Sequence, residues 1–401
     1  MMTEKKNSLN IILIIGVVLI ASNLRAPITS IGPIVGIIAA DTGFSNALTG
    51  LLTTLSLLSF AAFSFFIPKI SFRYGIEYTL MAGLAVLTIG IILRSVNSIF
   101  TLFFGTIILG LAIAIGNVLL PSLIKREFPN NIGFMTGLYS VSMSIWAAIA
   151  SGLSVPLVLS FGLGWRAALM CWAIPSVIAF VFFLPQMSSS NPLSRRTYSP
   201  SGYLWRSKLA WQITLFMGLQ SLGFYSIISW LPEILYNQGL ETNFAGWLLS
   251  YMQIVSIPLT FIVPLIAGRL SNQRVIVLII FLFFLIGYFG LLYGSTFFLT
   301  LWITLIGIGQ GASISLALLF MGLRTTNTQQ SSELSGMAQS IGYLIAAGGP
   351  VFFGFLHDLT QSWTTTILIL IATTIIQLIV GLGAGGNKKI SIEEKAKVET
   401  I

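Results

Sequence analysis

Arg25 is the residue whose type and position most clearly suggest chemistry in this sequence. It lies inside a long apolar run near the N-terminus, in the segment 22–27 (Ser-Asn-Leu-Arg-Ala-Pro). A charged side chain inside a lipid-crossing segment is costly and usually faces a cavity or a partner. The planar guanidinium can hold a small anion through two parallel hydrogen bonds. Arg25 is therefore a candidate anion-binding residue; bonding backbone carbonyls near Pro27, or capping a neighbouring helix, is the structural alternative.

The acidic residues are placed where they cannot neutralise Arg25. All 11 of them fall in a tail, a loop or the end of a predicted span. A small anionic substrate would supply the missing counter-charge, whereas a cationic drug would not. The same pattern argues against proton coupling through a buried Asp or Glu. A coupling proton is still one of the alternatives. It could be moved by protonation of the substrate itself or as a hydroxide equivalent.

Polar and aromatic residues inside the predicted spans could orient such a solute. Thr29 lies one helical turn beyond Arg25, on the same face. The full set of candidates is Asn23, Thr29, Asn117, Tyr139, Gln220, Tyr225, Trp230, Gln310, Gln339 and Tyr343. Hydrogen bonding between helices is an equal explanation for each buried amide. Packing or interfacial anchoring is the alternative for Tyr139 and Trp230.

Four further polar residues are expected at the outer ends of spans. Arg94 and Arg166 can extend their guanidinium groups to water as interface anchors, and an external funnel or gate for anions is the alternative. His357 and Asp358 end a predicted span together. His357 is the only histidine and could titrate near physiological pH, although a hydrogen-bonded histidine at a helix end explains it as well.

Several classes of function have no support in the sequence. One cysteine, Cys171, and one histidine offer neither a disulfide nor a cluster of metal ligands. No phosphate-binding Gly-x-x-x-x-Gly-Lys-Ser/Thr pattern occurs, and no Ser/His pair or paired mid-span acids suggest an enzyme. We therefore expect no catalytic residues, no metal and no cofactor. The net charge of +9 is scattered between apolar runs, so nucleic acid is not an expected partner.

The composition indicates that lipid is the solvent of most of the chain. Only 8% of the residues are charged, 56% are hydrophobic, and the mean hydropathy is +0.94. About 20 helical residues cross a bilayer core of about 30 Å. The predicted spans are 10–39, 46–67, 77–97, 100–123, 133–158, 166–185, 209–231, 244–267, 275–293, 297–321, 332–355 and 364–384. The first could be a signal peptide, but it continues without a clear cleavage site.

The basic residues orient these spans. All of the 20 Lys and Arg except Arg25, Arg94 and Arg166 fall in tails or loops on one side of the predicted membrane. Cytoplasmic loops carry such an excess of Lys and Arg. The sequence therefore predicts a multi-pass protein of a bacterial cytoplasmic membrane, with both termini in the cytoplasm.

The twelve spans divide into two similar halves. We expect an N-terminal six-helix half at 1–187, a cytoplasmic linker at 188–208, a C-terminal six-helix half at 209–386 and a cytoplasmic tail at 387–401. The linker could instead form a short amphipathic surface helix. At an offset near 200 residues, the matches are Gly110 and Lys125 with Gly309 and Arg324, Gly137 with Gly336, and Trp165 with Trp363. These matches indicate a parallel repeat of six spans.

Several motifs resemble the major facilitator superfamily and, within it, the cyanate/2-nitroimidazole transporter-like permeases of bacteria. The matching segments are 23–27, 31–33, 116–121, 164–166, 210–233, 309–311, 334–340 and 356–358. The resemblance covers nearly the whole chain and implies the major facilitator fold. It implies a cytoplasmic loop motif at Lys69, Arg73, Gly75 and Arg269. Pro68 and Phe72 stand where the superfamily usually has glycine and an acid, so the usual acid-mediated latch is not expected.

The combined prediction is an all-α secondary transporter that exposes a central site alternately to each face of the membrane. The resemblance implies a cyanate-, nitrate- or nitroimidazole-like substrate. A small-drug efflux pump of the same superfamily is one alternative, and a membrane solute sensor is another. The expected partners are a small-molecule substrate and membrane lipid, and the expected oligomeric state is a monomer.

Overall fold

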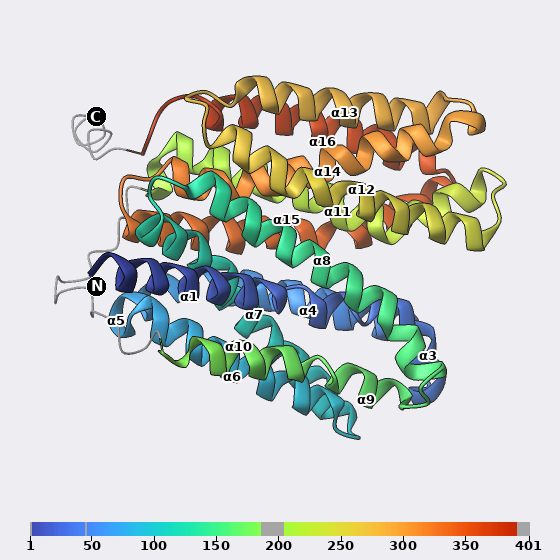
Figure 1. Ribbon diagram of the computed structural model, residues 1–401. Coiled ribbons are helices and arrows are strands. Elements are labelled where there is room, and N and C mark those ends of the chain that lie inside the picture. The colour runs from blue at the N-terminus through green and yellow to red at the C-terminus, as the bar shows by residue number, and fades with distance from the viewer. Residues whose placement is uncertain (1, 45, 186–203, 391–401) are drawn as a thin grey trace. The chain divides into compact units, whose positions relative to one another are not determined.

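The computed structural model describes residues 2–44, 46–185 and 204–390 (Figure 1). Within those ranges the chain forms helices and turns and no strand. Eleven helical segments are long and apolar enough to cross a membrane, and a bent pair of helices would make twelve. The predicted all-α polytopic fold is thereby confirmed. Most of the predicted linker, 188–203, and of the predicted tail, 391–401, lies outside the described residues.

The chain divides into two compact units. Unit 1 comprises Met1–Leu123 and Leu138–Pro200, and unit 2 comprises Ile124–Gly137 and Ser201–Ile401. The helices that begin in unit 1 are α1 (Met2–Ser22), α2 (Ala26–Thr29), η1 (Gly32–Ile34), α3 (Val35–Thr42), α4 (Asn46–Ser64), α5 (Ile67–Tyr74), α6 (Ile76–Ser95), α7 (Ile99–Glu127), α9 (Gly164–Met170) and α10 (Ala173–Phe183). Helix α8 (Ile132–Leu159) begins in unit 2 and continues in unit 1.

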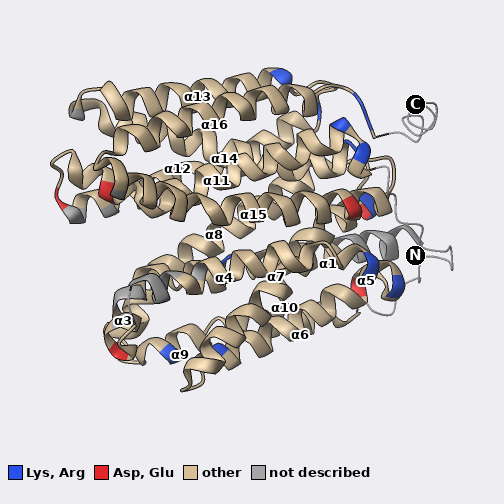
Figure 2. Ribbon diagram, turned by 180° about the vertical axis from the view of Figure 1, so that it is seen from behind, with Lys and Arg blue, Asp and Glu red and all other residues tan. Residues whose placement is uncertain are grey.

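The remaining helices belong to unit 2. They are η3 (Leu204–Arg206), α11 (Lys208–Asn237), α12 (Thr242–Ala267), α13 (Arg274–Tyr293), η4 (Thr296–Phe298), α14 (Leu299–Leu323), α15 (Thr328–Thr360) and α16 (Trp363–Ala384). Figure 2 shows most acidic and basic residues near the ends of the helices, with long uncharged stretches between them. This distribution fits helices whose middle parts lie in lipid.

Prolines interrupt three of the helical segments in unit 1. A proline has no N–H for the carbonyl four residues earlier, and it disfavours helical geometry in the residue before it. The helix therefore breaks ahead of Pro27, between α1 and α2; ahead of Pro68, between α4 and α5; and ahead of Pro175, between α9 and α10. The α4–α5 break bends the pair by 55°. The first predicted span, 10–39, is consequently a series of short helices rather than one continuous helix.

Glycines allow close helix contacts within both units. Gly110 on α7 lies against the backbone of Ser56 on α4, where an added Cβ would be 3.0 Å from the Ser56 carbonyl oxygen. On α14, Gly311 lies against the Ser256 carbonyl of α12 in the same manner, and Gly309 packs on the ring of Phe284. Side chains at these positions would force the helices apart. The glycines are therefore packing residues.

At one end of unit 2, basic side chains bond to the carbonyl oxygens at helix ends. Lys125 Nζ lies 2.6 Å from the carbonyl oxygens of both Gly322 and Thr325. Arg324, which is 4% exposed, donates through Nε to the Ala384 carbonyl at 2.7 Å and through Nη2 to the side-chain oxygen of Gln273. The last carbonyls of a helix have no partner within that helix. These cations supply the missing donors and complement the helix dipole.

Candidate functional site

Arg25 lies at the break in the first span. The residues Asn23, Leu24 and Arg25 form a turn after α1, and Arg25 caps α2 with φ −120°. Its carbonyl oxygen accepts the N–H groups of Ile28 and Thr29, both at 3.0 Å. The Arg25 residue is half-buried. A charged residue at an interrupted helix inside a membrane-crossing segment has the placement expected of a binding residue.

Two other predicted site residues of unit 1 bond to each other. The hydroxyl of Tyr139 on α8 donates to Oδ1 of Asn117 on α7 at 3.0 Å. Tyr139 is fully buried, and Asn117 is 5% exposed. The guanidinium of Arg25 lies near enough to interact electrostatically with the Tyr139 hydroxyl. We call Arg25, Asn117 and Tyr139 the Arg25 cluster; it combines a cation, an amide and a phenol in one place.

Two other predicted site residues serve the backbone around the break. The Asn23 amide nitrogen donates to the Leu19 carbonyl at 2.8 Å and lies 3.3 Å from the Pro175 carbonyl at the second broken span. The Thr29 hydroxyl lies 3.1 Å from the carbonyl of Ala147 on α8. Both contacts join the interrupted first span to neighbouring helices. They favour a supporting role for Asn23 and Thr29.

The expectation that Arg94 extends to water is wrong. Arg94 lies in the last turn of α6 and is 0% exposed. Its Nη1 donates to the carbonyl oxygen of Pro27 at 2.7 Å. The sequence placed Arg94 at a helix end and therefore at the interface, but the broken first span provides a carbonyl partner inside unit 1. Only a prediction of that break could have indicated this contact.

Arg166 belongs to an exposed cluster that also contains Asp41. Arg166 Nη1 and the Trp165 indole Nε1 donate to Oδ2 of Asp41, at 3.0 Å and 2.8 Å. The Arg166 guanidinium also lies over the Trp165 ring, 4.1 Å from its centroid. The hydrogen bond from Trp165, followed by that from Arg166, holds the pKa of Asp41 below its ordinary value. Asp41 joins α3 to α9 in this way, a contact that the sequence does not predict.

The three predicted amides of unit 2 are all buried. Gln220 on α11 donates to the Ser221 hydroxyl at 2.6 Å and lies 3.3 Å from the sulfur of Met217. Gln310 on α14 is 5% exposed, and its Nε2 has no hydrogen-bond partner among the described residues. Gln339 on α15 is 0% exposed. A buried amide donor without a partner is costly, so Gln310 is the unit 2 amide best suited to receive a solute acceptor.

The predicted aromatic residues of unit 2 form two separate groups. The rings of Tyr225 on α11 and Tyr343 on α15 lie 6.5 Å apart in an edge-on arrangement. The Trp230 ring lies 5.2 Å from that of Trp363, and its Nε1 donates to the Pro350 carbonyl at 2.8 Å. The His357 ring stacks on the Trp363 ring, with 4.1 Å between the ring centroids. Trp230 and His357 therefore belong to a packed aromatic group. The side chain of Asp358 is outside the part of the chain that the structure describes.

The loop-motif residues lie at or near helix ends, and three of the four are exposed. Lys69 and Arg73 are exposed on α5, and Arg269 is exposed after α12. The Arg73 guanidinium lies 5.4 Å from the ring centroid of Tyr74. Gly75 joins α5 to α6 with φ +93° and ψ 153°, a conformation that favours glycine. Gly75 is therefore required by the turn whatever the roles of its basic neighbours.

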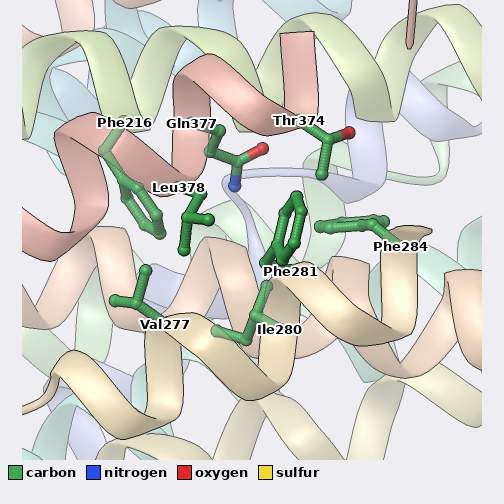
Figure 3. Close-up of a pocket in the computed structure, with 8 residues that line it drawn as sticks. All are labelled: Phe216, Val277, Ile280, Phe281, Phe284, Thr374, Gln377 and Leu378. Carbon is green, nitrogen blue, oxygen red and sulfur yellow. The ribbon is translucent and has the colours of Figure 1, made fainter. Parts of the chain in front are cut away.

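Figure 3 shows a pocket in unit 2 that is unsuited to a solute. Its lining residues are Phe216, Val277, Ile280, Phe281, Phe284, Thr374, Gln377 and Leu378, from α11, α13 and α16. Its volume of about 10 Å³ is near the minimum for one water molecule. The Gln377 amide already donates to the Ser313 hydroxyl at 2.6 Å. No group of metal-ligating side chains is found in the part of the chain that the structure describes.

Helices that are long and apolar enough to cross a membrane, together with glycine-packed helix pairs, are typical of a polytopic membrane protein. The chain belongs to the Major Facilitator Superfamily, whose family model matches residues 13–350. It is 48% identical over 386 residues to the uncharacterized transporter YycB of Bacillus subtilis (strain 168), covering 96% of each chain. It is 40% identical over 383 residues to a 2-nitroimidazole transporter of Escherichia coli (strain K12), covering 95% of this chain and 97% of that one.

Two further likenesses concern a more distant relative and the fold. The cyanate transport protein CynX of Escherichia coli (strain K12) is 25% identical over 370 residues, covering 90% of this chain and 95% of that one. The structure of the proton:xylose symporter XylE superposes with a TM-score of 0.77 over 99% of both chains, at 12% identity. The latter shows the fold alone. The family and these relatives are transporters, and the resemblance noted in the sequence is confirmed.

Proposed function

We propose that this transporter moves a small anionic or polar planar solute across a bacterial cytoplasmic membrane by alternating access. Arg25 supplies the positive charge that recognises the solute. Asn117 and Tyr139, the other members of the Arg25 cluster, orient it. The excess of Lys and Arg in alternate loops supports an orientation with both termini in the cytoplasm.

The Arg25 cluster is the observation that carries this proposal. Arg25 lies at a break in a membrane-crossing segment, beside a buried amide and a buried phenol that bond to each other. Interrupted helices commonly border the substrate sites of secondary transporters. A guanidinium with flanking hydrogen-bonding groups matches a planar anion better than an apolar drug, because it offers paired donors in a fixed plane.

The relatives supply the candidate solutes. One similar protein is named for 2-nitroimidazole and another for cyanate. Both solutes are small and planar or linear, with nitrogen or oxygen acceptors at their edges. Small solutes of this kind need a binding site with few hydrogen-bond donors and a small volume. We therefore favour them over sugars as substrates of this chain.

Thermal stabilisation by solutes tests the recognition step. The purified protein is heated with cyanate, nitrate, 2-nitroimidazole or pyrazine, the last as an uncharged heterocycle. A solute at about 100 times its Kd should stabilise the folded state by about 2.7 kcal/mol. We expect an anion to raise the apparent Tm of the wild type but not of R25A. R25K should respond weakly, because lysine keeps the charge but loses the planar fork.

Uptake into proteoliposomes then separates transport from binding alone. A carrier concentrates the stabilising solute or equilibrates it, and imposing a pH gradient shows whether protons are coupled. Binding without flux would identify a sensor. Equal stabilisation of the wild type and R25A by lipophilic drugs, with no response to anions, would contradict the proposal and favour an efflux pump.

A further inference from the structure

The buried Arg94 is only partly satisfied by its surroundings. Its side chain is 0% exposed, and Nη1 donates to the Pro27 carbonyl at 2.7 Å. Nε and Nη2 are also buried, and neither has a hydrogen-bond partner among the described residues. Burying a guanidinium in this way carries a large desolvation cost. The one bond to Pro27 is therefore the contact through which Arg94 acts on the rest of unit 1.

The Pro27 carbonyl needs a donor because the helix ends after α2. In a continuous helix it would accept the N–H of Ile31. Here the Ile31 N–H bonds instead to the carbonyl of Ile28, at 3.2 Å. The Ser30 hydroxyl lies 3.2 Å from the Pro27 carbonyl and is the other donor in reach. Arg94 thus replaces a main-chain donor that the broken first span lacks.

The α6 helix holds Arg94 at a fixed place. Gly90 on α6 and Gly105 on α7 bring the two helix backbones together, and an added Cβ on Gly90 would lie 2.8 Å from the Leu109 nitrogen. An added Cβ on Gly105 would lie 2.8 Å from the Arg94 Cα. Because this contact is formed by main-chain atoms and not by a flexible side chain, the main chain at Arg94 has little freedom to shift. Its guanidinium therefore sets where the Pro27 peptide lies.

We propose that Arg94 is a positioning residue that holds the peptide of Pro27, two residues after Arg25, and so fixes the direction in which Arg25 presents its guanidinium to the solute. The proposal rests on the proposed role of Arg25. Arg94 does not touch the solute. Its contribution is to keep the Arg25 turn in one arrangement against α6, so that solute binding does not have to order it.

The first measurement compares solute uptake by the wild type, R94M and R94K. Methionine fills the space without a donor, whereas lysine keeps the charge and one donor for the Pro27 carbonyl. For cyanate we expect R94M to raise KM about tenfold with a smaller change in kcat. R94K should recover most of the loss. A purely structural role would instead lower the amount of folded protein and leave the KM of the folded fraction unchanged.

The second measurement reports the position of residue 25 without using a solute. Cys171 is replaced by serine, and R25C is introduced with either Arg94 or R94M. The rate at which uncharged methyl methanethiosulfonate modifies the new thiol is then measured, because an anionic reagent would respond to the loss of the Arg94 charge itself. We expect R94M to change this rate about tenfold, with R94K close to the Arg94 rate. S229C, an exposed position on α11 in unit 2, serves as the matched control and should react alike in both backgrounds.

The combined outcomes separate the two proposals. An unchanged modification rate at R25C in R94M would overturn the positioning role, even if R25A abolishes cyanate binding. A changed rate with cyanate uptake that does not depend on Arg25 would leave the positioning role and contradict the proposed substrate site. If R94M does not fold, R94Q takes its place. The same results are expected, because the glutamine side chain is too short for its amide to reach the Pro27 carbonyl oxygen as the Arg94 guanidinium does.

Discussion

The hydroxyl of Tyr139 on α8 donates a hydrogen bond to Oδ1 of Asn117 on α7, at 3.0 Å. Both side chains are buried in unit 1. Y139F removes the donor and keeps the ring. We expect a loss of about 1 kcal/mol in unfolding free energy, as for a typical buried hydrogen bond, together with weaker stabilisation by the anionic solute. Apparent Tm values with and without solute measure both effects.

The neighbouring Ser140 offers a matched control for this change. Its buried hydroxyl has no hydrogen-bond partner among the described residues. S140A therefore removes a hydroxyl without breaking a bond, and the apparent Tm should be unchanged or slightly higher. Equal decreases in apparent Tm in Y139F and S140A would show that the Tyr139–Asn117 hydrogen bond does not stabilise the folded protein.

Two adjacent glycines on α15 should respond oppositely to alanine. A Cβ on Gly349 would lie 2.5 Å from the Ser226 hydroxyl and 3.2 Å from Cγ of Leu222, both on α11, whereas a Cβ on Gly348 would meet nothing within 4 Å. We expect G349A to destabilise the protein by roughly 1–3 kcal/mol through overpacking. G348A should be neutral or stabilise by up to about 1 kcal/mol, because alanine favours a helix. Melting curves of the two variants decide this; a harmless G349A would show that α11 and α15 can separate freely.

Arg324 and Arg274 both donate to carbonyls at the end of α16 but differ in burial. The buried Arg324 bonds to Ala384 and to Gln273, and the exposed Arg274 bonds to Leu382 at 3.0 Å. R324A should cost on the order of 3 kcal/mol, since it breaks two charged hydrogen bonds in a buried place. R274A should cost about 0.5 kcal/mol, because water replaces its single exposed bond. Chemical unfolding of both variants measures the difference, and equal losses would contradict the importance of burial here.

The exposed Asp41 should make stability depend on acid pH. Hydrogen bonds from Trp165 and then Arg166 hold the pKa of Asp41 below its ordinary value of 3.8. Because the folded pKa is the lower one, the stabilising contribution is complete above the unfolded pKa and is lost as the pH falls through the folded pKa. The Tm difference between wild type and D41N should therefore be present at about pH 6 and shrink below about pH 4. A difference that stays constant over this range would exclude the Asp41 charge as its source.

The sequence predicted the helical fold because its signals are large and repeated. Apolar runs of span length and the loop positions of Lys and Arg are averages over many residues, so errors at single positions have little effect. The breaks in unit 1 are local. Pro27, Pro68 and Pro175 each come just after an interruption, but Pro121, Pro156 and Pro232 lie inside continuous helices. Proline alone therefore does not tell which spans break.

The candidate site was predicted in part. Arg25, Asn117 and Tyr139 are each candidates from their residue types, but the hydrogen bond between Tyr139 and Asn117 depends on how α7 and α8 pack, which the sequence does not show. Arg94 was misjudged because its position at a helix end indicated water, while its partner is a main-chain oxygen freed by the Pro27 break. The Asp41 contact with Trp165 joins residues 124 positions apart, a distance over which side-chain type gives no guidance.

The partners of Arg94, Lys125 and Arg324 have a common character: each of these cations bonds to at least one backbone carbonyl oxygen. A carbonyl is present whatever amino acid stands at that position. Exchange of the partner residue in the course of evolution therefore leaves the acceptor in place, and no compensating change in the cation is required. Such contacts would leave little trace of paired substitution between related sequences, so methods that infer proximity from correlated changes would overlook the bonds that secure the Pro27 break and the ends of α14 and α16.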